Sequence, residues 1–455
     1  MFAIAVAIVA LSLIYLAIII AKSRRALPVP TEGDTDLQYV IVVPCLDEEV
    51  VIGNTLEALT RLPADRVRII VVDDDSEDAT AAIAHQFAPR VEVLQRRRPH
   101  ARIGKGDSLN LAFNHILATL DRPTDKVVMG VIDADGRLEP VVVDVLDRNF
   151  SDPNVGGVQL AVSINNRHAG LLPRMQDFEF LGFAPILLTA REHFGTVALG
   201  GNGQFARLSE LEKLGPMPWT DSLTEDLDLG IRLALGGSQI RFTPEAQVNQ
   251  QGLADIPRLL RQRTRWVQGH IQAWSLIPDV FRSNLPNRAF LDFLYLLLSP
   301  GLMFLSSLVF ALAPALLAWT LATGAYAWDE PRLWLFLGAI YLLMFGPAMF
   351  YGAAYARHRD EVSLPRALGL AHLMPLYTYV WYIAVWRALG RIVTGRHSWA
   401  KTARLTEEPA APGQTRPAPG RHRRPKEVLA QPGHPPREVA GTLVTERTAE
   451  EGSPR

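Results

Sequence analysis

Acidic side chains stand close together at three points of this chain, and arginines gather at a fourth. In chain order the four motifs are Asp73-Asp74, Asp133-Ala134-Asp135, Glu225-Asp226 and Gln262-Arg263-Thr264-Arg265-Trp266. Carboxylates can hold a divalent cation, bind hydroxyl groups or remove a proton, and guanidinium groups bind phosphate oxygens. Together, these groups could transfer a sugar from a nucleoside diphosphate.

Asp133 and Asp135 are separated by a single residue. Residues i and i+2 of an extended backbone point to the same side, so both carboxylates could face one ligand. Magnesium favours few protein carboxylates, with phosphate oxygens and water completing its shell. We therefore expect this pair to bind a metal ion that neutralises charge on a departing diphosphate.

Asp73 and Asp74 follow the apolar run Ile69–Val72. Their carboxylates could accept hydrogen bonds from a nucleobase N–H group or from ribose hydroxyls. The alternative is structural, a capped turn that leads into a helix at Asp78. Lys105, which stands between two glycines, is a further candidate for a phosphate or ribose contact at the start of a helix.

Glu225 and Asp226 precede a helix-like run over residues 227–235. We expect Asp226 to be the general base, which removes a proton from an acceptor hydroxyl as that oxygen attacks the sugar. The structural alternative assigns the motif to the start of the helix, with Thr224 as its N-cap.

Four arginines crowd residues 258–265, next to leucine and tryptophan side chains. One interpretation is an amphipathic helix at a membrane surface, with its basic residues near lipid headgroups. The other is a clamp in which Arg265, together with Arg263, binds a diphosphate while Trp266 stacks on an acceptor sugar. Both can hold, because four arginines of one helix cannot all point the same way.

Gly200-Gly201-Asn202-Gly203 follows the apolar run 196–199. Three glycines in four residues allow the backbone to approach a sugar or a phosphate closely. A plain turn is the alternative.

Short β-branched runs alternate with helical stretches between residues 36 and 285. We expect strands over 40–43, 68–72, 91–94 and 127–132, and helices over 47–60, 78–87 and 105–120. Such alternation predicts an α/β domain with a mostly parallel sheet and helices on both faces. Ligands bind at the carboxyl ends of the strands in such sheets, and three acidic motifs fall at these ends.

The charge balance and the cysteine content narrow the possibilities. Lysine and arginine number 46 against 47 aspartate and glutamate residues, which argues against nucleic acid as a partner. The one cysteine, Cys45, excludes an intrachain disulfide. We expect it to be a core residue, because nothing nearby would activate a thiolate.

Residues 2–21 are uncharged and long enough to span a bilayer. Lys22, Arg24 and Arg25 follow directly, and the positive-inside bias places them in the cytoplasm. A cleavable signal peptide is the alternative. We expect residues 1–25 to form a transmembrane helix of the plasma membrane, with the domain at 36–285 in the cytoplasm.

Further uncharged stretches occupy residues 293–328, 333–356 and 367–386. Pro300-Gly301 interrupts the first, which could form one span or two, so we expect three or four late spans within 286–405. Arginines at both ends of the last stretch favour the cytoplasmic side, and both placements can hold only if that stretch is re-entrant. Residues 406–455 have the composition of a disordered tail.

The ordered motifs resemble those of the family 2 glycosyltransferases, and most closely the membrane-bound synthases of cellulose, chitin, hyaluronan and poly-N-acetylglucosamine. The resemblance covers roughly residues 38–402, and Gln262-x-x-Arg265-Trp266 is its most specific element. It implies a GT-A fold and a UDP-sugar donor bound with Mg²⁺ or Mn²⁺.

The motifs and the resemblance together give expected roles for individual residues. Those expected at the donor are Asp73, Asp74, Lys105, Asp133, Asp135 and Arg265, the last two aspartates also holding the metal. Those expected at the acceptor or the diphosphate are Gly201, Asn202, Glu225, Gln262, Arg263, Trp266 and Trp399. Two positions depart from the family pattern. Pro44-Cys45-Leu46-Asp47-Glu48 stands where Pro-x-Tyr-Asn-Glu is usual, and Asp75 replaces a usual glycine.

Three functions follow from these expectations. The first is an inverting transferase that adds glucose or N-acetylglucosamine to a growing β-linked polysaccharide. The second adds one sugar to a lipid such as diacylglycerol or a polyprenyl phosphate. The late spans are few for a secretion channel, which favours either a partner subunit or this lipid acceptor. The third is a transporter or an inactive subunit. A transporter is disfavoured because the late apolar stretches lack charged residues, and an inactive subunit because the acidic motifs are retained.

Overall fold

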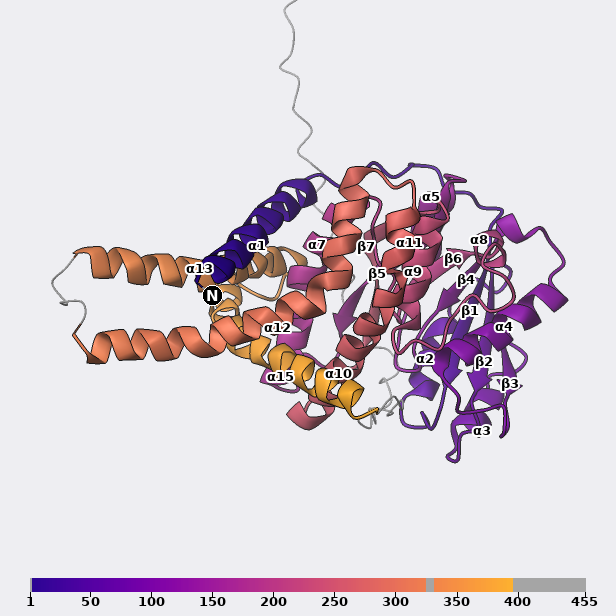
Figure 1. The fold of residues 1–455 in the computed structure, drawn as a ribbon. Coiled ribbons are helices and arrows are strands. Elements are labelled where there is room, and N and C mark those ends of the chain that lie inside the picture. Colours follow the sequence, from indigo (N-terminus) through magenta and orange to yellow (C-terminus); the bar gives the residue numbers. More distant parts are fainter. Residues whose placement is uncertain (1, 325–330, 396–455) are drawn as a thin grey trace, which may run out of the picture. The chain divides into compact units, whose positions relative to one another are not determined.

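A seven-stranded sheet forms the centre of the α/β domain (Figure 1), with Asp73 and Asp74 at the carboxyl end of one strand and Asp133 and Asp135 after another. In spatial order its strands are β3 (Val91–Gln95), β2 (Val67–Asp73), β1 (Gln38–Cys45), β4 (Val127–Val131), β6 (Gln204–Arg207), β5 (Val155–Ile164) and β7 (Gln239–Gln250). Only β6 runs antiparallel to its neighbours. The prediction of a mostly parallel sheet is confirmed. The computed structural model describes residues 2–324 and 331–395.

Helices cover both faces of the sheet because alternate residues of each strand point to opposite sides. Ile41 and Val43 of β1 lie in one apolar core with α2 (Ile52–Leu59) and α5 (Val141–Phe150). Val40 and Val42 lie in a second core, which includes residues of the helices α4 (Lys105–Thr119), α8 (Leu208–Glu212) and α9 (Glu225–Leu235). The short helix α3 (Thr80–His85) packs against β2 and β3.

A long helical segment between β5 and β6 packs against the apolar helices of the chain. It consists of α6 (Leu171–Phe178), the π-helical segment η2 (Glu179–Phe183) and α7 (Ala184–Glu192). The segment η2 packs against α13 (Pro331–His358), and α7 packs against α1 (Phe2–Ser23). The domain that contains the sheet is therefore packed against the apolar helices α1 and α13.

The arginine-rich stretch forms α10 (Ile256–Gln272), which continues through η3 (Ala273–Leu276) into α11 (Ile277–Arg282). Asp255 is its N-cap and accepts a hydrogen bond from Arg258 N at 2.9 Å. Buried residues recur along one face of α10, against α15 (Met374–Val393). This is the amphipathic helix that the sequence predicts.

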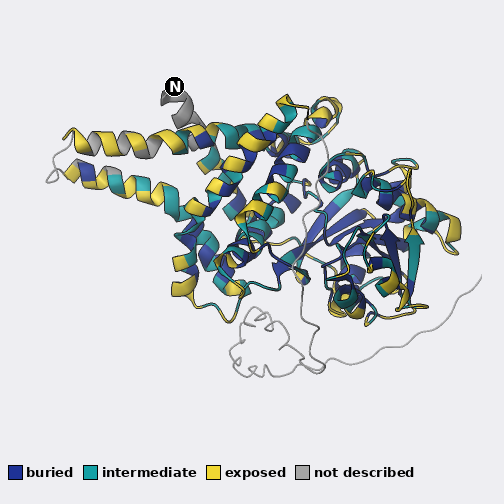
Figure 2. Ribbon diagram, turned by 90° about the horizontal axis from the view of Figure 1, so that it is seen from below, coloured by how far each residue is buried: buried dark blue, intermediate teal, exposed yellow. Residues whose placement is uncertain are grey.

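Within the described residues, three segments are long and apolar enough to cross a membrane: 287–312, 333–358 and 364–393. The helix α12 (Asn287–Ala322) and α13 run side by side away from the sheet, and Figure 2 shows exposed residues along both. With 36 residues, α12 is roughly 54 Å long, well beyond the ~30 Å of a bilayer core. Its first turns lie beside the catalytic domain instead, where Asp292 pairs with Arg191.

The predicted break at Pro300-Gly301 does not form, because α12 is continuous there. A proline inside a helix leaves the carbonyl four residues earlier without its N–H donor, here that of Leu296. His270 of α10 supplies the missing bond, with its Nε2 2.8 Å from Leu296 O. Burial lowers the pKa of His270 to about 4, so the ring is neutral. A side chain of α10 thus satisfies the carbonyl that Pro300 leaves without its helical donor, within a helix that continues past the proline.

The last apolar stretch is divided into α14 (Leu364–Ala371) and α15. Before α14, Arg359 pairs with Asp177 of α6 at 2.7 Å. Near the end of α15, Arg391 Nε donates to Gln268 Oε1 of α10 at 3.0 Å. Both ends of this stretch therefore lie against the same catalytic domain.

Candidate active site

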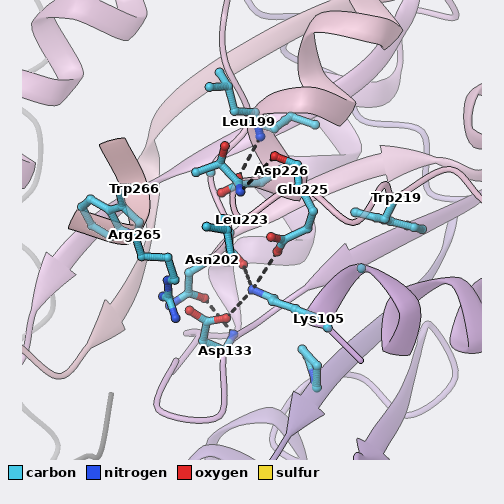
Figure 3. Close-up of a pocket in the computed structure, with 18 of the residues that line it drawn as sticks. Lys105, Asp133, Leu199, Asn202, Trp219, Leu223, Glu225, Asp226, Arg265 and Trp266 are labelled. Atoms are coloured by element: carbon cyan, nitrogen blue, oxygen red, sulfur yellow. Dashed lines mark hydrogen bonds and ion pairs between the residues drawn. The ribbon is translucent and has the colours of Figure 1, made fainter. Parts of the chain in front are cut away.

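The carboxyl ends of the strands open into a cavity of about 870 Å³ (Figure 3). Ten of the predicted site residues line it: Asp74, Lys105, Asp133, Gly201, Asn202, Glu225, Asp226, Gln262, Arg265 and Trp266. They come from six separate parts of the chain. The fold therefore assembles into one site what the sequence presents as scattered motifs.

Lys105 stands at the centre of this cavity, in the first turn of α4 (Figure 3). Its Nζ lies 2.6 Å from Asp133 Oδ1, 2.9 Å from Gly201 O and 3.7 Å from Glu225 Oε1. Burial opposes the charged form, but the neighbouring Asp133 and Glu225 prevail and raise the pKa of Lys105. The lysine thus stays cationic and holds three elements together.

Glu225 and Asp226 begin α9 and face the cavity. Burial raises the pKa of Glu225 to about 7 and raises that of Asp226 above its usual 3.8, while Lys105 opposes both shifts. Carboxylates with raised pKa values in a cleft are suited to proton transfer near neutral pH. Thr224 is the N-cap residue of α9, as the structural alternative predicts, but its side chain makes no capping hydrogen bond.

The loop at Gly201 and Asn202 lines the same cavity as Glu225 and Asp226. Gln159 of β5 holds it, accepting from Gly200 N at 2.8 Å and donating to Asn202 O at 2.9 Å. Asn202 Oδ1 in turn accepts from Asp133 N at 3.1 Å. The loop therefore fixes the backbone of Asp133 as well as its own.

Replacing Gly201 by alanine is expected to lower activity about tenfold without unfolding the protein, since small displacements of reacting groups are costly. A Cβ there would lie 3.2 Å from both Asp226 Oδ2 and Lys105 Nζ. Gly200→Ala is the matched control, because its Cβ would meet nothing closer than 3.7 Å. The measurement is the initial rate of UDP release by each purified variant. Equal rates for the two variants would contradict this account.

Asp133 and Asp135 do not face the same way. Residues 133–136 form a turn closed by Gly136 N and Asp133 O at 2.7 Å, not the predicted extended backbone. Asp133 therefore lines the cavity, whereas Asp135 is 2% exposed and accepts from Gln251 N at 3.0 Å. The structure places Asp135 behind the cavity wall.

Asp73 and Asp74 also separate. Asp73 is fully buried at the end of β2, where it accepts from Ser76 N at 3.3 Å and so closes a turn. Asp74 lines the cavity, and its Oδ1 lies 2.7 Å from Arg96 Nη1. Burial raises the pKa of Asp74. The next residue, Asp75, has φ 66°, in the left-handed region that glycine adopts easily and aspartate tolerates. This explains why glycine is usual there.

Arg263 lies on the opposite face of α10 from Arg265. Residues i and i+2 of an α-helix point about 200° apart around the helix axis. The guanidinium groups of Arg263 and Arg265 therefore diverge. Arg265 lines the cavity, while Arg263 is fully buried between the rings of Trp266 and Trp381, 4.0 and 4.8 Å from their centroids. Glu179 of η2 pairs with it at 2.6 Å. Arg263 therefore does not line the cavity in which the sequence predicts its contact with a diphosphate.

The structure adds residues that the motifs do not reveal. One wall of the cavity is apolar, and its members include Phe180, Ala184, Leu187, Leu188 and Phe242. They come from η2, α7 and β7, and no local spacing marks them as site residues. Glu179 is likewise recognisable only from its contact with Arg263. Trp399 lies outside the described residues.

Comparison with known families agrees with this geometry. The model described as "Glycosyl transferase family group 2" matches residues 129–385, and "Glycosyl transferase family 2" matches residues 40–207. A mannosyltransferase from Pyrobaculum calidifontis, solved with GDP-Man and Mn²⁺, shares the fold with a TM-score of 0.53. Its identity is 20%, over 82% of this chain and 98% of that one.

Two curated relatives are more similar in sequence. The beta-monoglucosyldiacylglycerol synthase of Synechocystis is 31% identical over 274 residues, which are 58% of this chain and 55% of the relative. The probable glycosyltransferase YdaM of Bacillus subtilis is 32% identical over 256 residues, or 54% and 59% of the two chains. The matches thus span a little over half of each relative. Since this family model covers more than half of the chain, and the site residues from Asp133 to Trp266 lie within its match, the protein belongs to glycosyl transferase family group 2.

Proposed function

We propose that this protein transfers a hexose, glucose or N-acetylglucosamine, from a UDP-sugar to a hydroxyl group of a membrane lipid. The observation that supports it most directly is the apolar wall formed by Phe180, Ala184, Leu187, Leu188 and Phe242, which shares one cavity with Glu225 and Asp226. An acceptor with an apolar body would bury this wall while its hydroxyl meets the acids. The Synechocystis relative, by its name, makes a glucosyl lipid.

Asp74, Asp133 and Lys105 would form the donor end of the site. Their side chains offer hydrogen-bond acceptors for the nucleoside and a cation for the diphosphate. Arg265, across the cavity, supplies a second cation of a shape that suits phosphate oxygens. The acceptor would approach from the side of Trp266 and the apolar wall.

A divalent ion fits this donor set, with Mg²⁺ or Mn²⁺ as candidates. Among the described residues no three His, Cys, Asp or Glu side chains form a ready-made metal site. Asp133 would therefore hold the ion together with diphosphate oxygens, the arrangement that Mg²⁺ favours, while Asp135 lies behind the cavity wall. When bound, the ion would offset charge on the diphosphate.

The transfer itself would use Asp226 as the base. Its carboxylate takes the proton of the acceptor hydroxyl, the oxygen bonds to the anomeric carbon, and the bond to the diphosphate breaks, which inverts the configuration. Arg265 and Lys105 would stabilise the leaving UDP by their positive charge. Glu225 shares the buried pocket and, with a pKa of about 7, could hold a proton beside the base.

A growing glycan is the second candidate acceptor. Trp266 lines the cavity, and an indole face is a suitable platform for a sugar ring. Extension through the membrane would then require an accessory secretion subunit, because the described chain offers few spans.

One experiment separates these acceptors. The full chain, purified in detergent, is incubated with Mg²⁺, radiolabelled UDP-glucose or UDP-N-acetylglucosamine, and diacylglycerol in mixed micelles. We expect label in the organic phase, dependent on the diacylglycerol. Label that remains aqueous, grows in size and needs no lipid would instead favour the glycan. Donor hydrolysis without either product would contradict both.

We also propose that the catalytic domain is cytoplasmic in a multi-pass protein of the plasma membrane, and that α14 and α15 return to the cytoplasmic side. The support is that Arg359 and Arg391, at the two ends of this stretch, both contact the catalytic domain. Basic residues prefer the cytoplasmic side. This arrangement removes the conflict between the two arginine clusters.

Cysteine labelling tests this arrangement in a Cys45→Ser background that has no other thiol. Thr394→Cys, just after α15, is expected to react with an impermeant maleimide only in inverted membrane vesicles. Thr323→Cys, just after α12, is the control and is expected to react only in intact spheroplasts. Labelling of Thr394→Cys from the outside would show that α15 crosses the membrane.

A further inference from the structure

A second cavity, of about 420 Å³, lies away from the candidate active site. It is formed by the loop that leads into α6, by the connection between α13 and α14, and by α14 itself. The residues that decide its chemistry are Arg167, His168, Arg174, Glu361, Arg366 and Leu370. None of them belongs to the motifs discussed above.

The walls of this cavity carry an excess of positive charge. Arg167 is neutralised by its ion pair with Glu361. Arg174 and Arg366 are exposed, and neither has a carboxylate within ion-pair distance in the part of the chain that the structure describes. Burial lowers the pKa of His168, and so do the positive charges of Arg167 and Arg174. This lowered pKa is consistent with an excess of positive charge around the cavity. Two arginines are thus left to bind an anion.

The position of the cavity indicates where that anion comes from. One apolar segment, 333–358, ends just before it, and the next, 364–393, begins at its edge. Leu370 and Val362 add apolar surface to the arginine walls. A cavity at the end of a membrane-crossing helix, part basic and part apolar, matches the headgroup region of a bilayer.

We propose that this cavity binds the phosphate group of an anionic membrane phospholipid, with Arg174 and Arg366 as its ligands. The two arginines come from α6 and α14, so a phosphate between them would tie these helices together. The helix α6 continues into η2, whose Phe180 lines the active site. Anionic lipid would therefore stabilise the wall that receives the acceptor.

Lipid retention by the purified full chain tests the proposal. The wild type and the double variant Arg174→Gln/Arg366→Gln are titrated in neutral detergent with short-chain phosphatidylglycerol and, separately, phosphatidylcholine, and binding is read from native mass spectra. The wild type is expected to prefer phosphatidylglycerol. The variant should bind it roughly thirtyfold more weakly, since each arginine near an anionic lipid contributes about a factor of five.

Arg282→Gln/Arg288→Gln is the matched control, because both arginines are exposed and lie outside this cavity. It should bind phosphatidylglycerol like the wild type. Equal affinity of the Arg174→Gln/Arg366→Gln variant and the control would overturn the proposal, and so would equal binding of both lipids by the wild type. Competition by millimolar glycerol phosphate with the full effect of the lipid would show a site for a soluble phosphate instead. The thermal midpoint of each variant, measured without lipid, separates loss of binding from loss of folding.

Discussion

Replacing Asp226 by asparagine is expected to reduce sugar transfer roughly a thousandfold, the usual loss when a general base is removed. Asparagine keeps the size of the side chain and can still bond Leu227 N, which now donates to Asp226 Oδ1 at 2.8 Å. It cannot take a proton. Donor binding should survive, because Asp74, Lys105 and Asp133 remain in place. The rate of UDP release and the affinity for UDP by calorimetry measure the two effects separately.

Asp228→Asn is the control for this change, since it alters the same residue type on the same helix. Asp228 points away from the cavity and pairs with Arg232 at 2.6 Å. We expect it to lower thermal stability slightly and to leave the turnover near that of the wild type. An Asp226→Asn enzyme with full turnover would remove Asp226 from the mechanism.

Replacing Glu179 by glutamine is expected to destabilise the protein by about 3–5 kcal/mol, because it leaves the charge of Arg263 buried without its partner. Arg263 has no exposed surface, and Glu179 is its one carboxylate partner among the described residues. The same ion pair holds the guanidinium against Trp266. We therefore also expect a higher KM for the acceptor and an unchanged affinity for UDP. Thermal midpoints and steady-state kinetics give the two values.

The double variant Glu179→Gln/Arg263→Met distinguishes stability from positioning. Removing both charges should restore most of the lost stability, since buried ion pairs can be replaced by apolar groups at little cost. The acceptor KM should stay high, because methionine cannot hold Trp266 as a planar guanidinium does. A single variant with the thermal midpoint of the wild type would contradict the expected loss of stability. A double variant with the wild-type acceptor KM would show that Arg263 does not position Trp266.

The position of the acidic residues at the strand ends could be predicted from the sequence, because the ends of the buried runs and the rule for parallel sheets both indicate it. Buried runs such as 69–72 end where Asp73 begins, and parallel strands bring their ends to one edge of the sheet. What the sequence could not provide was the direction of each side chain at that edge. The turn after β4 rotates Asp135 behind the wall, and the end of β2 buries Asp73.

Other features depend on partners distant in the chain. Pro300 leaves one carbonyl of α12 without its helical donor, and the residue that satisfies it, His270, lies in a different helix. The apolar wall and Glu179 belong to helices whose own sequences look like ordinary packing surfaces. Spacing within a segment cannot reveal such contacts, because they arise from how segments pack together.

The π-helical segment η2 has a consequence for how this protein tolerates insertions and deletions. A π-turn holds one residue more than an α-turn, so it shifts the register between α6 and α7 by about 100°. That offset lets α6 direct Asp177 to Arg359 while Ala190 of α7 packs in the cluster with Ile19 of α1. Loss of a single codon within 179–183 would turn one helix against the other and disrupt both contacts at once. A substitution within 179–183 can weaken these contacts to a smaller or larger extent, whereas a deletion or an insertion disrupts both.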